Sequence, residues 1–180
     1  MARPSRQHRW WHKDENVVIL NRGAVTFGIP RTWTVEGKAE GLGYLNLTDP
    51  SDSCSLQISC LNLPPMSEPP PIDEMLRDVA VKTHPSASLA PITMTTRQRG
   101  GVAMAWLDCS YGEQDTDRDE WRTAHARLLF AYNMVFGALL TFYYWEDDLA
   151  WAVPAFERVV ETLQLGDRGL LRPDPSTRRN

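Results

Sequence analysis

Hydrophobic and polar residues alternate in short runs through the first third of the chain. In "CSLQISC", every second residue from Cys54 to Cys60 is apolar, which is typical of a strand with one buried face. Similar runs, ended by Pro30 or by turn residues, predict strands at 17–20, 24–29, 43–49 and 54–61. Because consecutive strands tend to be neighbours, we expect these strands to build one antiparallel sheet.

Two segments have the period of an amphipathic helix instead. Residues 72–83 follow Pro71 and place apolar side chains on one face and charged side chains on the other. Residues 146–165 carry an apolar stripe at spacings of three and four, with acidic residues at the start. We expect Pro154 in the first turn of this second helix or at a kink just before it.

The most hydrophobic stretch is "LLFAYNMVFGALLTFYYW", residues 128–145. A transmembrane helix needs about 20 apolar residues, and Asn133 interrupts this stretch of eighteen. The stretch is also rich in Phe, Tyr, Val and Thr, which favour strands. We therefore predict no transmembrane segment but two strands joined near Asn133, the second being a central strand covered on both faces.

The segment between the two helices predicts paired strands. Residues 92–99 and 102–111 are expected to form a hairpin around Gly100 and Gly101, and 102–111 then pairs with 121–132 across the charged loop 112–120. Symmetric pairing about that loop places the residues opposite one another as follows: Val102 and Phe130, Met104 and Leu128, Trp106 and Ala126, Asp108 and Ala124, Leu107 and His125, Cys109 and Thr123.

This register brings Cys109 and His125 together on the more polar face, which is the beginning of a nucleophile and base pair. No carboxylate that would orient the histidine is identifiable, so a small enzyme or ligand-binding protein with a pocket near these residues is kept as the alternative function. The three cysteines form no CxxC pair, and Cys54 and Cys60 would lie roughly 20 Å apart on a strand. We expect buried free thiols, no metal site and no cofactor.

The charged loop has the spacing that opens a calcium-binding loop, with Asp115, Asp117 and Asp119 at alternate positions. An EF-hand needs Gly at the sixth position and Glu at the twelfth, where this chain has Glu120 and Ala126. An EF-hand is therefore excluded, and a weak cation site at the hairpin tip is kept as an alternative. The preferred hypothesis is a solvated acidic loop in which these three aspartates and Glu120 contact a basic partner.

Charge divides the 180 residues into three parts. Residues 1–16 and 167–180 each carry four basic and two acidic groups, whereas 17–166 carry 11 basic and 19 acidic groups. We predict a basic aromatic tail at 1–16, one folded domain at 17–166 and a disordered tail at 167–180. The acidic domain argues against nucleic-acid binding. No apolar segment follows the basic residues of the first tail, so a cytoplasmic location is expected.

The first tail contains "HRWWHK", in which Arg9, Trp10 and Trp11 stand together. Trp and Arg dominate the energetics of many interfaces, so these three residues could form a docking peptide for a protein partner. The alternative is that the two tryptophans fold back onto the edge of the domain's own sheet. The sequence leaves both possibilities open.

The order of elements, with "VTFGIPRTW" at residues 25–33 and a final helix ending in "FERVVETLQL", resembles the fold family shared by PsbP of photosystem II and the Mog-type Ran-binding import factor. The resemblance covers roughly residues 17–165. It implies an α+β fold, an α/β/α sandwich with a central antiparallel sheet covered by helices on both faces. It also implies a non-catalytic accessory subunit that binds a protein partner or a larger assembly. The tail and the acidic loop, identified from their own residues, are the contacts that we expect.

Overall fold

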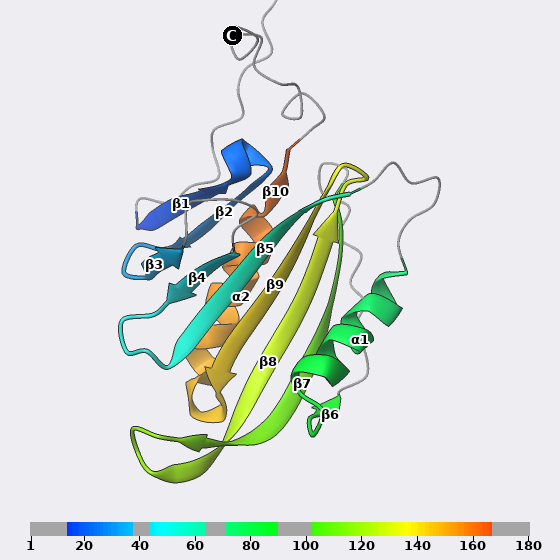
Figure 1. The fold of residues 1–180 in the computed structure, drawn as a ribbon. Coiled ribbons are helices and arrows are strands. Elements are labelled where there is room, and N and C mark those ends of the chain that lie inside the picture. The colour runs from blue at the N-terminus through cyan, green and yellow to red at the C-terminus, as the bar shows by residue number, and fades with distance from the viewer. Residues whose placement is uncertain (1–13, 38–43, 64–70, 90–101, 167–180) are drawn as a thin grey trace, which may run out of the picture.

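The computed structural model describes residues 14–37, 44–63, 71–89 and 102–166. They form two sheets and two α-helices (Figure 1). In chain order the elements are β1 (Glu15–Leu20), η1 (Asn21–Gly23), β2 (Val25–Pro30), β3 (Thr34–Gly37), β4 (Tyr44–Thr48), β5 (Cys54–Asn62), α1 (Ile72–Thr83), β6 (Ser88–Leu89), β7 (Ala103–Asp115), β8 (Glu120–Tyr132), β9 (Phe136–Trp145), η2 (Glu146–Asp148), α2 (Leu149–Thr162) and β10 (Gln164–Leu165). The predicted α+β class is confirmed, and every strand pairing within the described residues is antiparallel.

The larger sheet has the strand order β3-β4-β5-β9-β8-β7-β6, so β9 is its central strand. The predicted bend at Asn133 is confirmed, because β8 ends at Tyr132 and β9 begins at Phe136. The side chain of Asn133 holds the turn: its Oδ1 accepts hydrogen bonds from the backbone N–H groups of Val135 at 3.2 Å and Phe136 at 3.0 Å. Within the described residues, no helix is long and apolar enough to cross a membrane.

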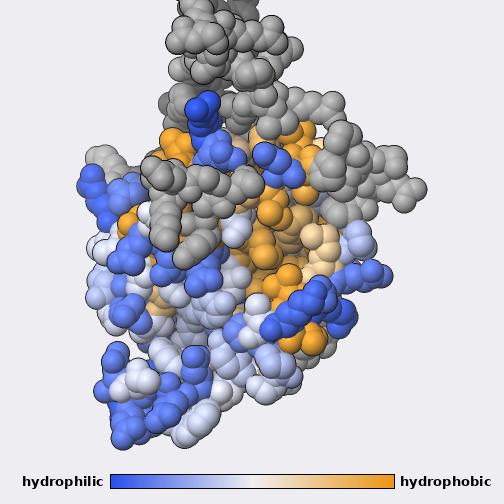
Figure 2. All heavy atoms as spheres, viewed as in Figure 1, coloured by the Kyte–Doolittle hydropathy of each residue, from blue (hydrophilic) through white to orange (hydrophobic). Residues whose placement is uncertain are grey.

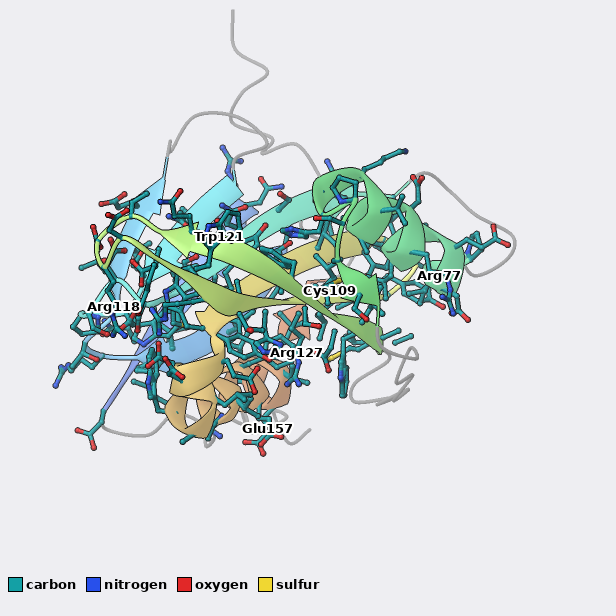
Figure 3. The ribbon with its side chains drawn as sticks, turned by 90° about the horizontal axis from the view of Figure 1, so that it is seen from below. Arg77, Cys109, Arg118, Trp121, Arg127 and Glu157 are labelled. Atoms are coloured by element: carbon teal, nitrogen blue, oxygen red, sulfur yellow. The ribbon has the colours of Figure 1, made fainter. Side chains whose placement is uncertain are left out.

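Alternate side chains of the large sheet belong to two separate cores. Helix α1 contributes Leu76 and Ala80 to one core. The sheet contributes alternate residues of two strands to it, Ala105 to Cys109 in β7 and Ala126 to Tyr132 in β8. Helix α2 packs Phe156 and its neighbours into the other core, together with buried residues of β2, β5 and β9. Seen from below, α1 and α2 lie on opposite sides of the strands (Figure 3). Strands β3, β4 and β5 extend beyond the part of the sheet that α1 overlies (Figure 1).

Helix α1 has the bounds that its amphipathic period predicts, 72–83. The second helix is shorter than predicted, because α2 ends at Thr162 and residues Gln164–Leu165 form the strand β10. Pro154 lies inside α2, further from its start than we expected. The extended conformation begins at Leu163, whose ψ of 127° leaves the helical region.

The expectation that all early strands join one sheet is wrong. Strands β1, β2 and β10 form a separate three-stranded sheet, in which β2 pairs with both of the others. This small sheet shares a core with α2, and the buried Thr162 hydroxyl accepts a 2.9 Å hydrogen bond from the backbone N–H of Gly28. The strand predicted at 92–99 lies outside the described residues, and β7 pairs on its outer side with β6.

The predicted register of the long hairpin is also wrong. Strand β7 continues to Asp115 and β8 begins at Glu120, so the turn comprises residues 116–119. The centre of the hairpin is therefore displaced, and Cys109 pairs with Ala126 while Leu107 pairs with Leu128. Much of the charged segment thus belongs to the two strands. Charged residues have low strand propensity, so the sequence did not indicate this extension.

Candidate functional site

The end of the β7–β8 hairpin projects beyond the rest of the sheet (Figure 1). The last residue of β9, Trp145, pairs with Ala124, so residues 112–123 form an extension that we call the β7–β8 arm. Hydrophilic residues gather over this end of the molecule (Figure 2). Figure 3 shows Arg118 at the tip of the arm and Trp121 along it.

Arg122 fixes the arm against the end of β9. Its guanidinium donates hydrogen bonds to Asp115 at 2.6 Å and to Asp147 at 3.0 Å, and its Cζ atom lies 4.5 Å from the centre of the Trp145 ring. The Arg122 side chain is only 8% exposed. Cation–π contact and charge-assisted hydrogen bonds together give the guanidinium a defined position. These contacts therefore hold the arm in a defined position against the end of β9.

The predicted partner-binding acids occupy different environments. Asp115 is buried, and its Oδ1 accepts hydrogen bonds from the backbone N–H groups of Asp117 and Arg118. The hydrogen bond from Arg122 is the main reason that the pKa of Asp115 lies below its ordinary value. Asp117, Asp119 and Glu120 are exposed at the tip. Of the four, Asp115 therefore has a structural role, and the other three stay predicted contacts.

Trp121 is the most exposed large hydrophobic residue of the described chain, at 75%. It pairs with Gln114 and lies against Gly112 of the neighbouring strand. The sequence indicated Trp121 only as the first residue of a strand. The other predicted aromatic contact, Arg9 with Trp10 and Trp11, lies outside the described residues.

A cavity of about 170 Å³ lies where the arm joins the sheet. Strands β5, β7, β8 and β9 and the turn before β5 supply its walls, through Asp52, Ser53, Cys54, Ser55, Tyr111, Glu113, Ala124, His125, Tyr143, Tyr144 and Trp145. We call it the Tyr111–Tyr143 cleft. None of its acids or tyrosines could be singled out from the sequence, because they come together only through the pairing of β5, β7, β8 and β9.

The turn that forms one wall of the cleft is held by a buried carboxylate. Asp49 accepts backbone hydrogen bonds from Ser51 at 2.9 Å, from Ser53 at 2.9 Å and from Cys54 at 2.7 Å. Asp52 lies within this turn with a positive φ of 56°, a conformation that Asp tolerates better than most residues. The exposed Asp52 is thereby placed at the cleft.

His84, which follows α1, supports the aromatic side of the cleft. Its ring stacks on Tyr111 with centroids 4.4 Å apart, and it meets Tyr143 edge-on at 5.8 Å. Burial is the main reason that the pKa values of both tyrosines are raised, and the nearby Glu113 carboxylate raises them further. Burial lowers the pKa of His84, although Glu113 opposes that shift. At neutral pH the cleft therefore presents neutral phenol groups beside a carboxylate.

The predicted Cys109 and His125 pair is wrong. Cys109 lies in the core beneath α1, where burial raises the pKa of its thiol to about 11. The cross-strand partner of Cys109 is Ala126, whereas that of His125 is Ser110, so the two side chains point to opposite faces of the sheet. His125 stacks on Tyr144 and contacts Glu146. The two residues cannot act as a nucleophile and its base.

Neither a cluster of metal ligands nor a disulfide is present in the described parts of the chain. No group of three His, Cys, Asp or Glu side chains among those residues could hold a metal ion. Cys54, Cys60 and Cys109 are all free and buried, as the alternating pattern predicts for the first two.

The sequence of this chain is similar to a family of proteins and to a bacterial protein. Residues 16–168 match the sequence profile of the family described as Alr1449. The chain is similar to the uncharacterized protein alr1449 of Nostoc sp. PCC 7120, with 28% identity over 172 residues, which cover 94% of this chain and 86% of the relative.

Solved structures confirm the fold that the sequence resemblance implies. Cyanobacterial PsbP (CyanoP) from Synechocystis sp. PCC 6803 aligns with a TM-score of 0.56 and 12% identity, over 87% of this chain and 95% of that one. The Ran-binding protein Mog1p of Saccharomyces cerevisiae aligns with a TM-score of 0.55 and 12% identity, over 87% and 97%. The chain spans about half the length of a Bacteroides thetaiotaomicron protein, with a TM-score of 0.50, 16% identity and 87% of this chain covered. The fold is PsbP-like and Mog-type.

Proposed function

This chain belongs to the Alr1449 family, and for this member we propose a non-catalytic role as an accessory subunit that binds a protein partner. Two structural neighbours, CyanoP and the Ran-binding protein Mog1p, share its fold, and the name of the second describes protein binding. The architecture that we propose for it is a sandwich in which α1 covers one face of the large sheet and α2 covers the other. A cytoplasmic location remains part of the proposal.

The observation that carries the proposal is the β7–β8 arm. Trp121 exposes 75% of its surface on a hairpin whose position Arg122 fixes through Asp115 and Asp147. A large aromatic residue on a rigid support loses little conformational freedom on binding, which is a property of interface hot spots. The exposed acids around it would select a basic partner and speed its association. Arg9, Trp10 and Trp11 remain predicted as a second contact.

A non-catalytic role is further supported by the cysteines. Burial raises the pKa of each of the three thiols, and a catalytic cysteine normally has a lowered pKa and an accessible thiolate. The separation of Cys109 from His125 removes the nucleophile and base pair that the sequence suggested.

The proposal is tested by affinity purification of the tagged chain from its host. The test variant is Asp117→Lys with Glu120→Lys, which reverses two exposed charges at the tip and leaves Asp119, with its φ of 52°, in place. The control is Glu36→Lys with Glu157→Lys, the same charge change on exposed positions of β3 and α2.

A partner that accompanies the wild type and the control at fixed stoichiometry, but is lost from the tip variant and from Trp121→Ala, would support the proposal. Circular dichroism must show equal folding of all four chains. Retention of the partner by both arm variants would contradict a role of the arm, and a wild-type chain that purifies alone would contradict the accessory role.

The Tyr111–Tyr143 cleft is an observation in favour of a second candidate, a ligand-binding protein. Of the two residues near which the sequence suggested a pocket, His125 lines this cavity and Cys109 does not. Its volume of about 170 Å³ is smaller than the roughly 300–1,000 Å³ of typical small-molecule sites, which argues against a small-molecule ligand in this cleft.

A further inference from the structure

The Tyr111–Tyr143 cleft contains two carboxylates, Glu113 and Asp52, that form no salt bridge within the described residues. Glu113 pairs across the hairpin with Arg122, but the guanidinium of Arg122 turns to Asp115 and Asp147. No salt bridge within the described residues reaches Glu113 or Asp52, and both are exposed. The cleft is therefore open to a cation from outside.

The walls of the cleft suit a cation that is flat and partly apolar. Tyr111 and Tyr143 are half-buried, and His84 stacks on Tyr111 at 4.4 Å, which supports the ring from the side of α1. The electron-rich faces of tyrosine rings attract cations. The carboxylate of Glu113 raises the pKa of both tyrosines, which indicates that the negative charge is felt at both rings.

The protein already recognises one guanidinium in this way beside the cleft. Arg122 lies 4.5 Å from the Trp145 ring centre and donates to two carboxylates, and Trp145 also lines the cleft. An aromatic ring with a pair of carboxylates matches the planar, multiply donating group of arginine. The cleft repeats these components with Tyr111, Tyr143, Glu113 and Asp52.

We propose that the Tyr111–Tyr143 cleft binds the guanidinium group of an arginine side chain that the protein partner supplies. The inference rests on the proposed function and names the chemical group through which the partner is recognised. The volume of about 170 Å³ suits one side chain and excludes a large cofactor. An anionic group is disfavoured because it would meet Glu113 and Asp52, neither of which forms a salt bridge within the described residues.

The direct test is a titration of the full chain with N-acetyl-arginine amide, followed by NMR chemical shifts. The matched probes are the citrulline analogue, which has nearly the same shape without the charge, and N-acetyl-lysine amide, which has the charge without the planar group. A probe of this size is expected to bind in the millimolar range. Arginine should bind at least tenfold more tightly than citrulline and more tightly than lysine, with shifts centred on Tyr111 and Tyr143.

Equal binding of arginine and citrulline, or no binding of arginine up to about 50 mM, a concentration well above the expected range, would overturn the inference. Lysine binding as tightly as arginine would overturn the assignment to guanidinium. These outcomes concern the wild-type chain, so they do not depend on whether a variant folds.

The site is tested by Glu113→Gln, with Glu36→Gln as the control on the exposed strand β3. Loss of one charge-assisted hydrogen bond is expected to weaken arginine binding about tenfold in the first variant and leave it unchanged in the second. Unchanged binding in Glu113→Gln would place the site elsewhere and overturn the inference.

The two proposals can fail separately. If the purified partner still depends on the tip of the arm while arginine probes do not bind, the accessory role stands and the arginine site is wrong. If arginine binds the cleft with the expected selectivity but no partner accompanies the wild-type chain, the cleft is a site for a cation and the accessory role is wrong.

Discussion

Gly137 lies at a point of close packing in the central strand. A Cβ atom at this position would lie 3.1 Å from Cζ of Phe130 and 3.3 Å from Cδ2 of Leu63. Phe130 is fully buried and has little room to move. We expect Gly137→Ala to lower the free energy of unfolding by about 1–3 kcal/mol, because overpacking of a well-packed core is destabilising. Urea unfolding followed by circular dichroism measures the change.

Gly112 provides the matched control, since it is also a glycine in a strand. A Cβ atom there would meet Trp121 at an ordinary 3.8 Å. We expect Gly112→Ala to leave stability unchanged or to raise it by a few tenths of a kcal/mol, about the effect of lower entropy in the unfolded chain. Equal effects of the two substitutions would show that crowding at Gly137 is relieved by movement of its neighbours.

Asn133 shows how a correct prediction can rest on an incomplete reason. The sequence predicted a bend there because Asn tolerates a left-handed conformation. In the structure Met134 has the positive φ, at 67°, and Asn133 acts through its side chain, which also donates a 2.6 Å hydrogen bond to the backbone oxygen of Gly166. The residue type indicated the turn, whereas the contact with a segment 33 residues away required the fold.

At the scale of elements, the β7–β8 arm connects stability to pH. The pKa of Asp115 is lowered mainly by its hydrogen bond with Arg122. A carboxyl group whose pKa is lowered in the folded state adds stability above its unfolded pKa of about 3.9, and that stability is lost as the pH falls through the folded value. We therefore expect the unfolding free energy to fall on acidification below about pH 4, partly through Asp115.

The measurement is urea unfolding at neutral pH and at several values below about pH 4. Asp115→Asn should be less stable than the wild type at neutral pH and should lose less stability on acidification. Asp117→Asn, at an exposed position of the same turn, is the control and should follow the wild type. An acid dependence unaltered in Asp115→Asn would show that the arm's ion pair does not contribute.

Individual elements were more predictable than the way they pair. Helix α1 could be delimited at 72–83 because Pro71 precedes it and its charged and apolar faces separate cleanly. The hairpin register could not, since Gly112, Glu113 and Gln114 have the composition of a loop and become strand residues through pairing with β8. Strand β10 was missed because two residues carry no periodic signal, and its partner β2 lies far away in the sequence.

At the scale of the molecule, the candidate site depends on this pairing. The Tyr111–Tyr143 cleft combines residues from β5, β7 and β9 with the turn that contains Asp52. The charged segment 112–120 that the sequence identified has two roles: its residue Glu113 lines the cleft, and its residues 116–119 form the exposed tip of the arm. Asp115, which the sequence predicted as one of four acidic contacts for a partner, forms a salt bridge with Arg122 instead.

The cysteines are distributed between the two cores: Cys54 and Cys60 lie with α2, and Cys109 lies with α1. The reactivity of these thiols can therefore report whether the two cores unfold together or separately. Helix α1 buries only Leu76 and Ala80 fully, whereas α2 buries five residues. A layer with fewer buried contacts opens at a lower free-energy cost.

We therefore expect an alkylating reagent to modify Cys109 at lower urea concentrations than Cys54 and Cys60, as measured by mass spectrometry of peptides after quenching. Simultaneous modification of all three thiols would show that the domain unfolds as one cooperative unit. In either case the chain needs no introduced label, because each of its two cores already contains a buried thiol.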